Sequence, residues 1–128
     1  MYLRMDLKEI LHNGGLADFG DCLINFIYAL VLSRISGKYC GGRVPNSILS
    51  SAVINSGLRA FMGRRVDVHD RGDAAEALIA YAWSHGLLTI EDAVETLALH
   101  LNSKSSRASQ VDAFTSLLKL IMGRVLKD

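Results

Sequence analysis

Apolar residues recur along most of this chain at the three- and four-residue spacing that is typical of α-helices. Only one proline occurs among the 128 residues, and glycines follow several of the apolar segments, where helices would end. The broadest apolar stripe lies near the C-terminus and comprises Val111, Phe114, Leu117, Leu118, Ile121, Met122 and Val125. The pattern predicts an all-α fold, and we expect residues 1–128 to form a single domain.

The helical segments can be placed from this periodicity. They cover residues 2–13, 16–36, 47–56, 73–85, 87–101 and 110–126, with a short helical piece near 58–62 and polar loops at 37–46 and 63–72. Residues 22–32 are apolar on nearly every side, so the second helix is expected to be the central one, enclosed by the others. That apolar run covers about eleven residues, which is short of the 18 or more that a membrane span requires.

Polar residues and glycines at the ends of these segments are expected to cap the helices. The expected caps are Gly14 and Gly15 at the end of the first helix, Asn46 before the third, and capping boxes formed by Asp70 with Asp73 and by Thr89 with Asp92. Asn25, inside the apolar second helix, is expected to be an amide whose hydrogen bonds are satisfied within the fold.

Composition narrows the class of protein. Half of the residues are apolar, which is enough for one compact core, and the formal net charge is +1. A charge this small argues against nucleic-acid binding over the whole surface, although it leaves room for a local basic patch. The N-terminal residues carry charges and lack the apolar run of a secretory signal, so a cytoplasmic protein is expected. Cys22 and Cys40 lack the spacing of a zinc site or of a disulfide framework.

Acidic residues stand at the start of two segments that are otherwise apolar. Asp18 and Asp21 begin the second helix, while Asp73 and Glu76, three positions apart, share one face of the fourth. One interpretation is that these acids face water and complement the helix macrodipoles, which would contribute about 0.3 to 1 kcal/mol each. The other is that the two helices bring carboxylates together, since the glycine and alanines beside the acids are small enough for close approach.

A cluster of Asp21, Asp73 and Glu76 would need a counter-charge. At separations of about 5 Å, each ionised pair would repel by roughly 3 kcal/mol at an effective dielectric constant of about 20. A divalent cation removes this repulsion, and oxygen ligands without cysteine or histidine suit Mg²⁺ or Mn²⁺. Such an ion can polarise a phosphoryl oxygen and deprotonate a bound water, so we expect hydrolysis of a phosphodiester or a phosphoanhydride.

Two stretches resemble motifs of the ribonuclease III superfamily. LADFGDCLINF, residues 16–26, is similar to the family signature of an acid, Phe, Leu, Gly and Asp followed by apolar residues, and GDAAEALIAYAW, residues 72–83, is similar to its second motif. The motifs occur in the family's order, and the likeness, which extends over roughly residues 16–97, is closest to short archaeal members.

The resemblance implies an all-α ribonuclease III endonuclease domain, usually a homodimer. Asp21, Asp73 and Glu76 would be its catalytic and metal-binding carboxylates, with Mg²⁺ or Mn²⁺ as the cofactor. The implied activity is that of an endoribonuclease that hydrolyses double-stranded or structured RNA in RNA processing.

The chain departs from the full-length enzymes at one acidic position. Where they have a glutamate four residues before the glycine-linked aspartate, this chain has Ala17, and Asp18 is the candidate to replace it as a metal ligand. Mini-III enzymes, which are compact relatives, also lack that glutamate. No double-stranded RNA-binding domain is expected, because the chain stops at Asp128. Two alternatives stay open: a catalytically silent ribonuclease III-like module that binds RNA, and an all-α nucleotide pyrophosphohydrolase, whose typical Glu-Glu-x-x-Glu cluster is absent from this sequence.

A local excess of positive charge lies between the two motifs. Residues 34–71 contain seven basic and two acidic residues, a net charge of +5. A-form RNA is recognised mainly through its phosphates and 2′-hydroxyls, and a basic ridge beside an acidic site meets that need. The residues expected to bind RNA are Arg43, Arg64, Arg65, Arg71 and His69; the alternative is that these side chains are scattered and solvated.

Overall fold

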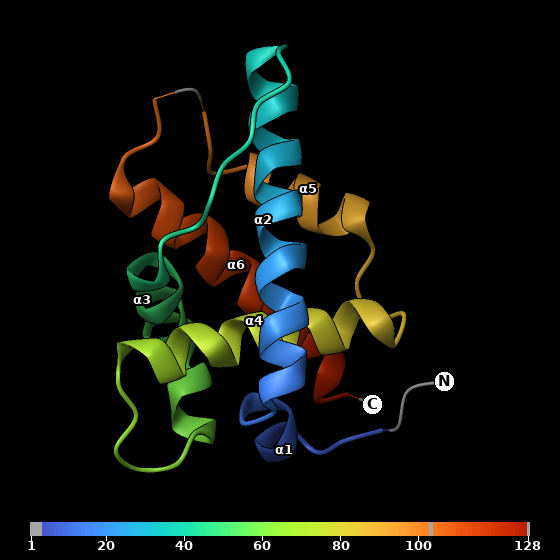
Figure 1. Ribbon diagram of the computed structural model, residues 1–128, viewed down its shortest axis with the longest axis vertical. Helices are drawn as coiled ribbons and strands as arrows, with labels where there is room; N and C mark the ends of the chain where they lie inside the picture. The colour runs from blue at the N-terminus through green and yellow to red at the C-terminus, as the bar shows by residue number, and fades with distance from the viewer. Residues whose placement is uncertain (1–3, 103, 128) are drawn as a thin grey trace.

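The computed structural model describes residues 4–102 and 104–127, and every regular element within them is helical. The elements are α1 (Leu7–Leu11), α2 (Gly14–Ser36), α3 (Asn46–Ser56), the short 3-10 helix η1 (Leu58–Phe61), α4 (Val68–Ser84), α5 (Ile90–Ala98) and α6 (Arg107–Val125). Figure 1 shows α2 and α4 crossing at a steep angle, with α1 below the crossing and α6 behind it. The expected all-α fold is confirmed.

The helix that the others enclose is α4. It packs against α1, α2, α3 and α6, and it contains a set of alanines with no exposed surface, namely Ala74, Ala75, Ala77, Ala80 and Ala82. Small side chains let several neighbouring helices approach this one closely. The expectation that the second helix would be the enclosed one is therefore wrong.

One face of α2 turns outward in the single chain. Phe19 is 46% exposed and Phe26 is 55% exposed, although the opposite face, which includes Ile24 and Ile27, is fully buried. By length and hydropathy α2 also meets the criterion for a membrane span, a test that core helices pass as well. Apolar residues on all sides of α2 therefore did not mean that the whole helix is buried: one face is buried and the other is exposed.

The two long helices touch at Gly20. A Cβ atom at this position would overlap the backbone carbonyl of Glu76, so only glycine permits the approach. The contact places Asp21, the next residue of α2, close to the second acidic motif on α4.

The first two helices are divided differently from the expectation. The expected first helix began in residues 1–3, which lie outside the described residues, and α1 is a short helix that begins after Asp6. Gly14 and Gly15, expected to end that helix, instead begin α2. The reason is that the side chain of Asn13 accepts a backbone hydrogen bond at 2.8 Å and caps α2.

The fourth helix begins at Val68, ahead of the expected start at Asp73. Its capping box is formed by Asp67 and Asp70, whose side chains accept each other's backbone N–H groups at 2.8 and 3.0 Å. The expected box of Asp70 with Asp73 is therefore wrong. Asp73 lies in the second turn of the helix, where no cap is needed.

The remaining helix starts differ in how well they were predicted. Pro45, not Asn46, occupies the N-cap position of α3, and no side chain caps that helix. The box of Thr89 with Asp92 before α5 is confirmed. The last helix begins at Arg107, three residues before the expected start at 110.

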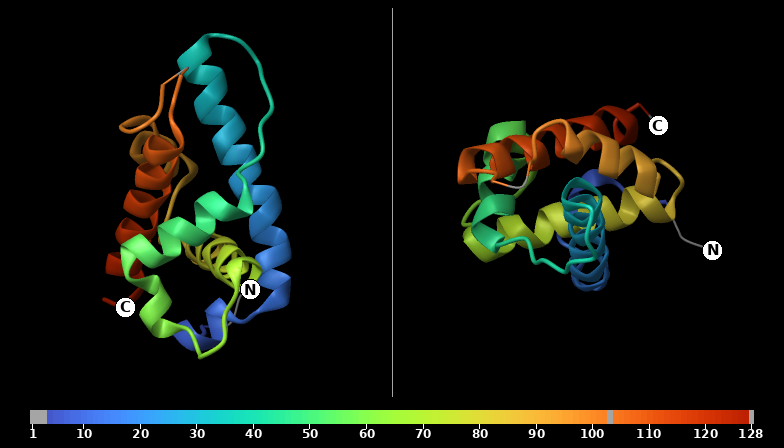
Figure 2. Two further views of the ribbon diagram at one scale, coloured as in Figure 1. Left: turned by 90° about the vertical axis from the view of Figure 1, so that its left-hand side faces the viewer. Right: turned by 90° about the horizontal axis from the view of Figure 1, so that it is seen from above.

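The connection between α2 and α3, residues 37–45, runs back along α2 (Figures 1 and 2). Ser33 Oγ donates to the Cys40 carbonyl at 3.1 Å and accepts the Cys40 N–H at 3.0 Å. Nearer the crossing, Asn25 Oδ1 accepts the Val44 N–H at 2.9 Å. These bonds bring the start of α3 beside the acidic turn of α2.

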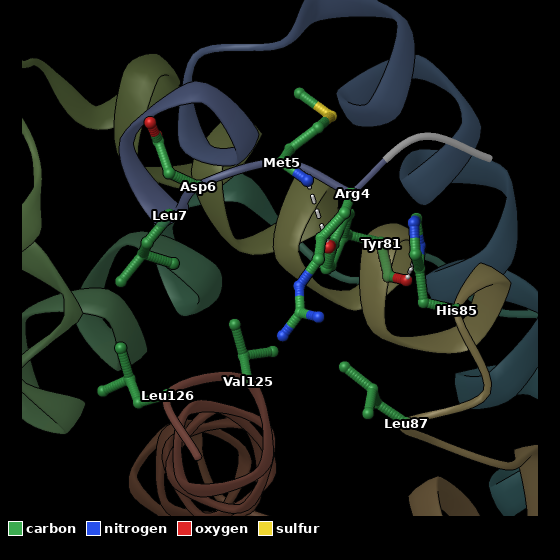
Figure 3. A pocket seen from close by; sticks show the side chains of 9 residues that line it. All are labelled: Arg4, Met5, Asp6, Leu7, Tyr81, His85, Leu87, Val125 and Leu126. Carbon is green, nitrogen blue, oxygen red and sulfur yellow. Dashed lines mark hydrogen bonds between the residues drawn. The ribbon is translucent and has the colours of Figure 1, made fainter. Parts of the chain in front are cut away.

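The N-terminal segment packs on the far end of α4. The Met5 N–H donates to Tyr81 Oη at 3.3 Å, and a cavity of about 360 Å³ lies between this segment, α4 and the end of α6 (Figure 3). The cavity is lined by none of the residues expected to form a functional site. Any site built from those residues lies elsewhere on the molecule.

Gly20→Ala should lower the free energy of unfolding by about 2 kcal/mol or more, because the added methyl group forces α2 away from α4. Gly123→Ala is the matched control inside α6, where a Cβ would meet no atom within 4 Å, and it should raise the free energy by about 0.5 to 1 kcal/mol. Urea denaturation followed by circular dichroism measures both changes. A Gly20→Ala protein as stable as the parent would contradict the close contact.

Candidate functional site

Three segments that are far apart in the sequence meet at one cavity of about 360 Å³. The cavity is lined by Asp21 of α2, by Arg43, Val44, Pro45 and Asn46 around the start of α3, and by Asp73 and Glu76 of α4. The structure thus brings together the three carboxylates selected in the sequence. Their meeting follows from the steep crossing of α2 and α4 and from the connection that runs back along α2 (Figure 1).

One face of α4 forms a wall of this cavity. Asp73 and Glu76 share that face with Gly72 and with His69, which is nearer the start of the helix. Glu76 is only 7% exposed because α2 packs against its backbone, whereas Asp73 is exposed. Glu76 is therefore largely withdrawn from water, whereas Asp73 loses only part of its hydration.

Burial raises the pKa of Glu76 from 4.5 to about 8. A hydrogen bond with Asp21 and the negative charges of Asp21 and Asp73 act in the same direction, and the charge of Arg43 opposes them. At neutral pH the Glu76 carboxyl group therefore stays protonated, and its O–H donates a hydrogen bond to the Asp21 carboxylate. The repulsion expected between these acids is relieved by a proton in the metal-free chain.

Asp18 lies outside the cavity. Its side chain is exposed, and its charge adds only a small part to the raised pKa of Asp73, which is caused mainly by burial and then by the charge of Asp70. Ala17 is buried and lines a smaller cavity of about 120 Å³ together with Asp70 and Asp73. The position of the family glutamate is thus beside Asp73, and Asp18 does not line the space there.

Asn25 holds Asp21 in place. Its Nδ2 donates to Asp21 Oδ1 at 3.1 Å and to the Asp21 carbonyl at 2.9 Å, while its Oδ1 accepts the Val44 N–H. The expectation of an amide with satisfied hydrogen bonds is confirmed. Its part in joining the acidic turn to the 37–45 connection was missed, although the four-residue spacing from Asp21 was an available signal.

The donor set fits a hard divalent cation. Asp21, Asp73 and Glu76 offer only carboxylate oxygens as ligands. A cation could replace the proton that Glu76 and Asp21 now share in a hydrogen bond. Within residues 4–102 and 104–127, no three His, Cys, Asp or Glu side chains are already arranged as a cation site. Binding of an ion by these carboxyl groups would require the Glu76 proton to leave.

Some of the basic residues between the two motifs hold the chain together. Arg71, expected to bind RNA, is half-buried and donates from Nε to Ser50 Oγ at 2.6 Å and from Nη1 to the Val66 carbonyl at 3.1 Å. Arg34 binds Glu91 through both terminal nitrogens, at 2.9 and 2.7 Å. These two guanidinium groups already have hydrogen-bond partners within the chain.

Arg43, Arg64 and Arg65 project outward. The Arg43 side chain is 81% exposed, and its Nη2 lies 3.9 Å from Asp21 Oδ2 at the edge of the cavity. Arg64 and Arg65 are exposed in the turn before α4, where Arg65 has a left-handed backbone with φ 58°. That backbone conformation is uncommon for residues other than glycine, so the intrinsic preference of Arg65 does not account for it.

Asn46, assigned to capping in the sequence, has a different role. Its Nδ2 lies 3.0 Å from His69 Nδ1, and its Oδ1 packs on Gly72, where a Cβ atom would overlap it. His69 itself is exposed in the first turn of α4. The sequence held no signal for this pair, because the two residues are 23 positions apart on different helices.

Comparison with known families tests the resemblance. A family model described as Ribonuclease III matches residues 14–126, which include α2 to α6 and every residue that lines the carboxylate cavity. The chain belongs to the ribonuclease III family. Comparison with curated proteins finds no match. Ribonuclease III membership supports a ribonuclease-type hydrolase, for which RNA is the class of substrate and a divalent metal the usual cofactor.

In this ribonuclease III domain, the proton on Glu76 makes stability depend on pH when metal is absent. The folded-state pKa of about 8 exceeds the ordinary 4.5, so the unfolded chain loses this proton first as the pH rises. The contribution of Glu76 to the free energy of unfolding should be complete below about pH 4.5 and be lost as the pH rises through about 8. Urea denaturation at a series of pH values in EDTA measures the decline.

Glu76→Gln is the matched variant, because an amide can donate to Asp21 but does not titrate. Its free energy of unfolding should show no comparable decline over this range. Mg²⁺ should reduce the decline in the parent protein, because a bound cation replaces the proton. Equal declines in the parent and in Glu76→Gln would contradict the assignment.

Proposed function

We propose that this chain is a divalent-metal-dependent endoribonuclease that hydrolyses phosphodiester bonds in double-stranded or structured RNA. The observation that carries the proposal is the meeting of Asp21, Asp73 and Glu76 in one cavity with Arg43 at its edge. Carboxyl groups from two helices meet there, and one of them keeps a proton because it is buried beside two other acids; a divalent cation could take the place of that proton.

Asp21, Asp73 and Glu76 would hold Mg²⁺ or Mn²⁺. When bound, the ion would polarise the scissile phosphate and help to deprotonate the attacking water, giving 5′-phosphate and 3′-hydroxyl ends. Asn25 keeps Asp21 oriented, and Glu76 gives up its proton so that its carboxylate can serve as a ligand. Arg43 is placed to contact a phosphate of the bound strand.

RNA would be held by exposed cations, one at the edge of the cavity and two in the turn before α4. Arg43, Arg64 and Arg65 offer positive charge to backbone phosphates, the groups through which A-form RNA is mainly recognised. The hydrogen bond from Arg71 to the Val66 carbonyl fixes the chain directly after Arg65. Arg71 would therefore act on RNA binding chiefly by holding this turn in shape.

Asp21→Asn should reduce cleavage of a labelled duplex RNA in Mg²⁺ by about 100-fold or more, because it removes a ligand charge. Binding of the same RNA should change little. A variant that combines Arg64→Glu and Arg65→Glu should weaken RNA binding by about tenfold or more, with a reduced dependence on salt. Asp112→Asn, an exposed change on α6, is the control and should affect neither property.

The same assays separate the alternatives. Cleavage that Asp21→Asn leaves unchanged would contradict the proposed metal site. RNA binding without any cleavage by the parent protein would favour a silent RNA-binding module. Release of pyrophosphate from nucleoside triphosphates, with duplex RNA left intact, would favour a nucleotide pyrophosphohydrolase.

We also propose that two copies pair through the outward face of α2. Phe26 and Leu30 line an open cavity of about 660 Å³ there, and Phe19 packs against Trp83 of α4 with ring centroids 5.7 Å apart. The apolar stripe of α6, in contrast, is mostly buried in the core. Asp21 and the outward face belong to the same helix, so pairing through α2 would bring two cavities near one another, as cleavage of both strands requires.

Phe26→Asp should convert a dimer of about twice 14.0 kDa into a monomer, because a carboxylate would be buried at the interface. Sedimentation velocity at micromolar concentration measures the change. Ile54→Asp, at a residue of α3 with a similar exposed fraction of 53%, is the control and should leave the mass unchanged. A parent protein that sediments as a monomer would contradict the pairing.

A further inference from the structure

Asn46 and His69 face each other at the edge of the carboxylate cavity. Asn46 Nδ2 lies 3.0 Å from His69 Nδ1. Asn46 lines the cavity together with the three acids, whereas His69 is exposed to solvent. The pair therefore links the cavity wall to the outer edge of α4.

The amide of Asn46 is held by its surroundings. Asn46 is the first residue of α3, and its Oδ1 packs on Gly72, where a Cβ atom would overlap it. Gly72 lies three residues after His69 and so shares its face of α4. The oxygen of the amide is thus against the α4 backbone, and its nitrogen is toward the imidazole.

This contact determines which imidazole nitrogen carries the proton. An amide NH₂ group can only donate, so His69 Nδ1 must accept, and the proton of the neutral ring is on Nε2. Nε2–H then points away from Asn46. On a nucleic acid, the acceptors that lie outermost are the phosphate oxygens.

We propose that Asn46 is a positioning residue that holds His69 with its Nε2–H outward, and that His69 donates this hydrogen bond to a phosphate of the RNA at the edge of the cavity. The RNA contact rests on the proposed function, whereas the positioning of the ring does not. His69 lies one helical turn before Asp73, so a phosphate bound by Nε2 is a neighbour of the carboxylate cavity. The contact would set the register of the RNA backbone without any preference for base.

Nitrogen-15 NMR of the neutral His69 ring tests the positioning without any substrate. The parent protein should show Nδ1 as an acceptor nitrogen and Nε2 as an N–H. Asn46→Ala should return the ring to a mixture of tautomers. Gly72→Ala should do the same although Asn46 and His69 are both unmutated, because its methyl group displaces the Asn46 amide. Asn55→Ala, an exposed change on the same helix, is the matched control and should leave the ring unchanged.

Binding of labelled duplex RNA in EDTA tests the phosphate contact. Asn46→Ala and His69→Ala should each weaken binding about fivefold, and the double variant should be no weaker than either, because the two residues act through one hydrogen bond. His69→Gln keeps an N–H near the position of Nε2 and should retain most of the affinity, whereas His69→Asn should not.

Each outcome decides one part of the inference. A proton on Nδ1 in the parent protein would overturn the positioning. Unchanged affinity in Asn46→Ala and His69→Ala, while the variant that combines Arg64→Glu and Arg65→Glu still weakens binding, would overturn the phosphate contact and leave the proposed function standing. A parent protein that binds no RNA would overturn the proposed function and the phosphate contact together, and the tautomer measurement would still report on the positioning.

Discussion

The contact between Gly20 and the backbone of Glu76 is the constraint on which the rest of the molecule depends. It allows α2 to lie directly on α4, the helix around which the core is built. The same contact withdraws the Glu76 carboxyl group from water and leaves Asp21, the residue after Gly20, beside it. Close packing and site chemistry therefore have one cause, and neither can be altered at this position without the other.

That packing creates a charge problem within the fold. A carboxyl group buried beside two other acids either keeps a proton, as Glu76 does, or requires a cation. The free energy of unfolding of a domain of this size is only about 5 to 15 kcal/mol. Whether Glu76 binds a proton or a cation therefore changes a large fraction of that free energy. Binding of a cation at these carboxyl groups would therefore be coupled to release of the Glu76 proton and to folding.

The positive charge between the motifs is divided between two uses. Arg34 and Arg71 bind groups inside the chain, where their planar guanidinium groups join separate segments. Arg43 keeps its charge exposed at the edge of the acidic cavity, and Arg64 and Arg65 keep theirs exposed in the turn before α4. Net charge per segment therefore overstated the number of cations available to a ligand, because it counts those that already have partners.

The sequence by itself determined what depends on neighbours along the chain: the all-α class, the Thr89 capping box, the pairing of Asp73 with Glu76 on one helix face, and the family. Tertiary structure decided which helix is enclosed, how strongly Glu76 holds its proton, and that Asn46 binds His69. Helical periodicity and capping act over three or four residues, so they can be read locally. Burial, proton affinity and the choice of partner depend on distances between remote segments, and only the packed chain sets those distances.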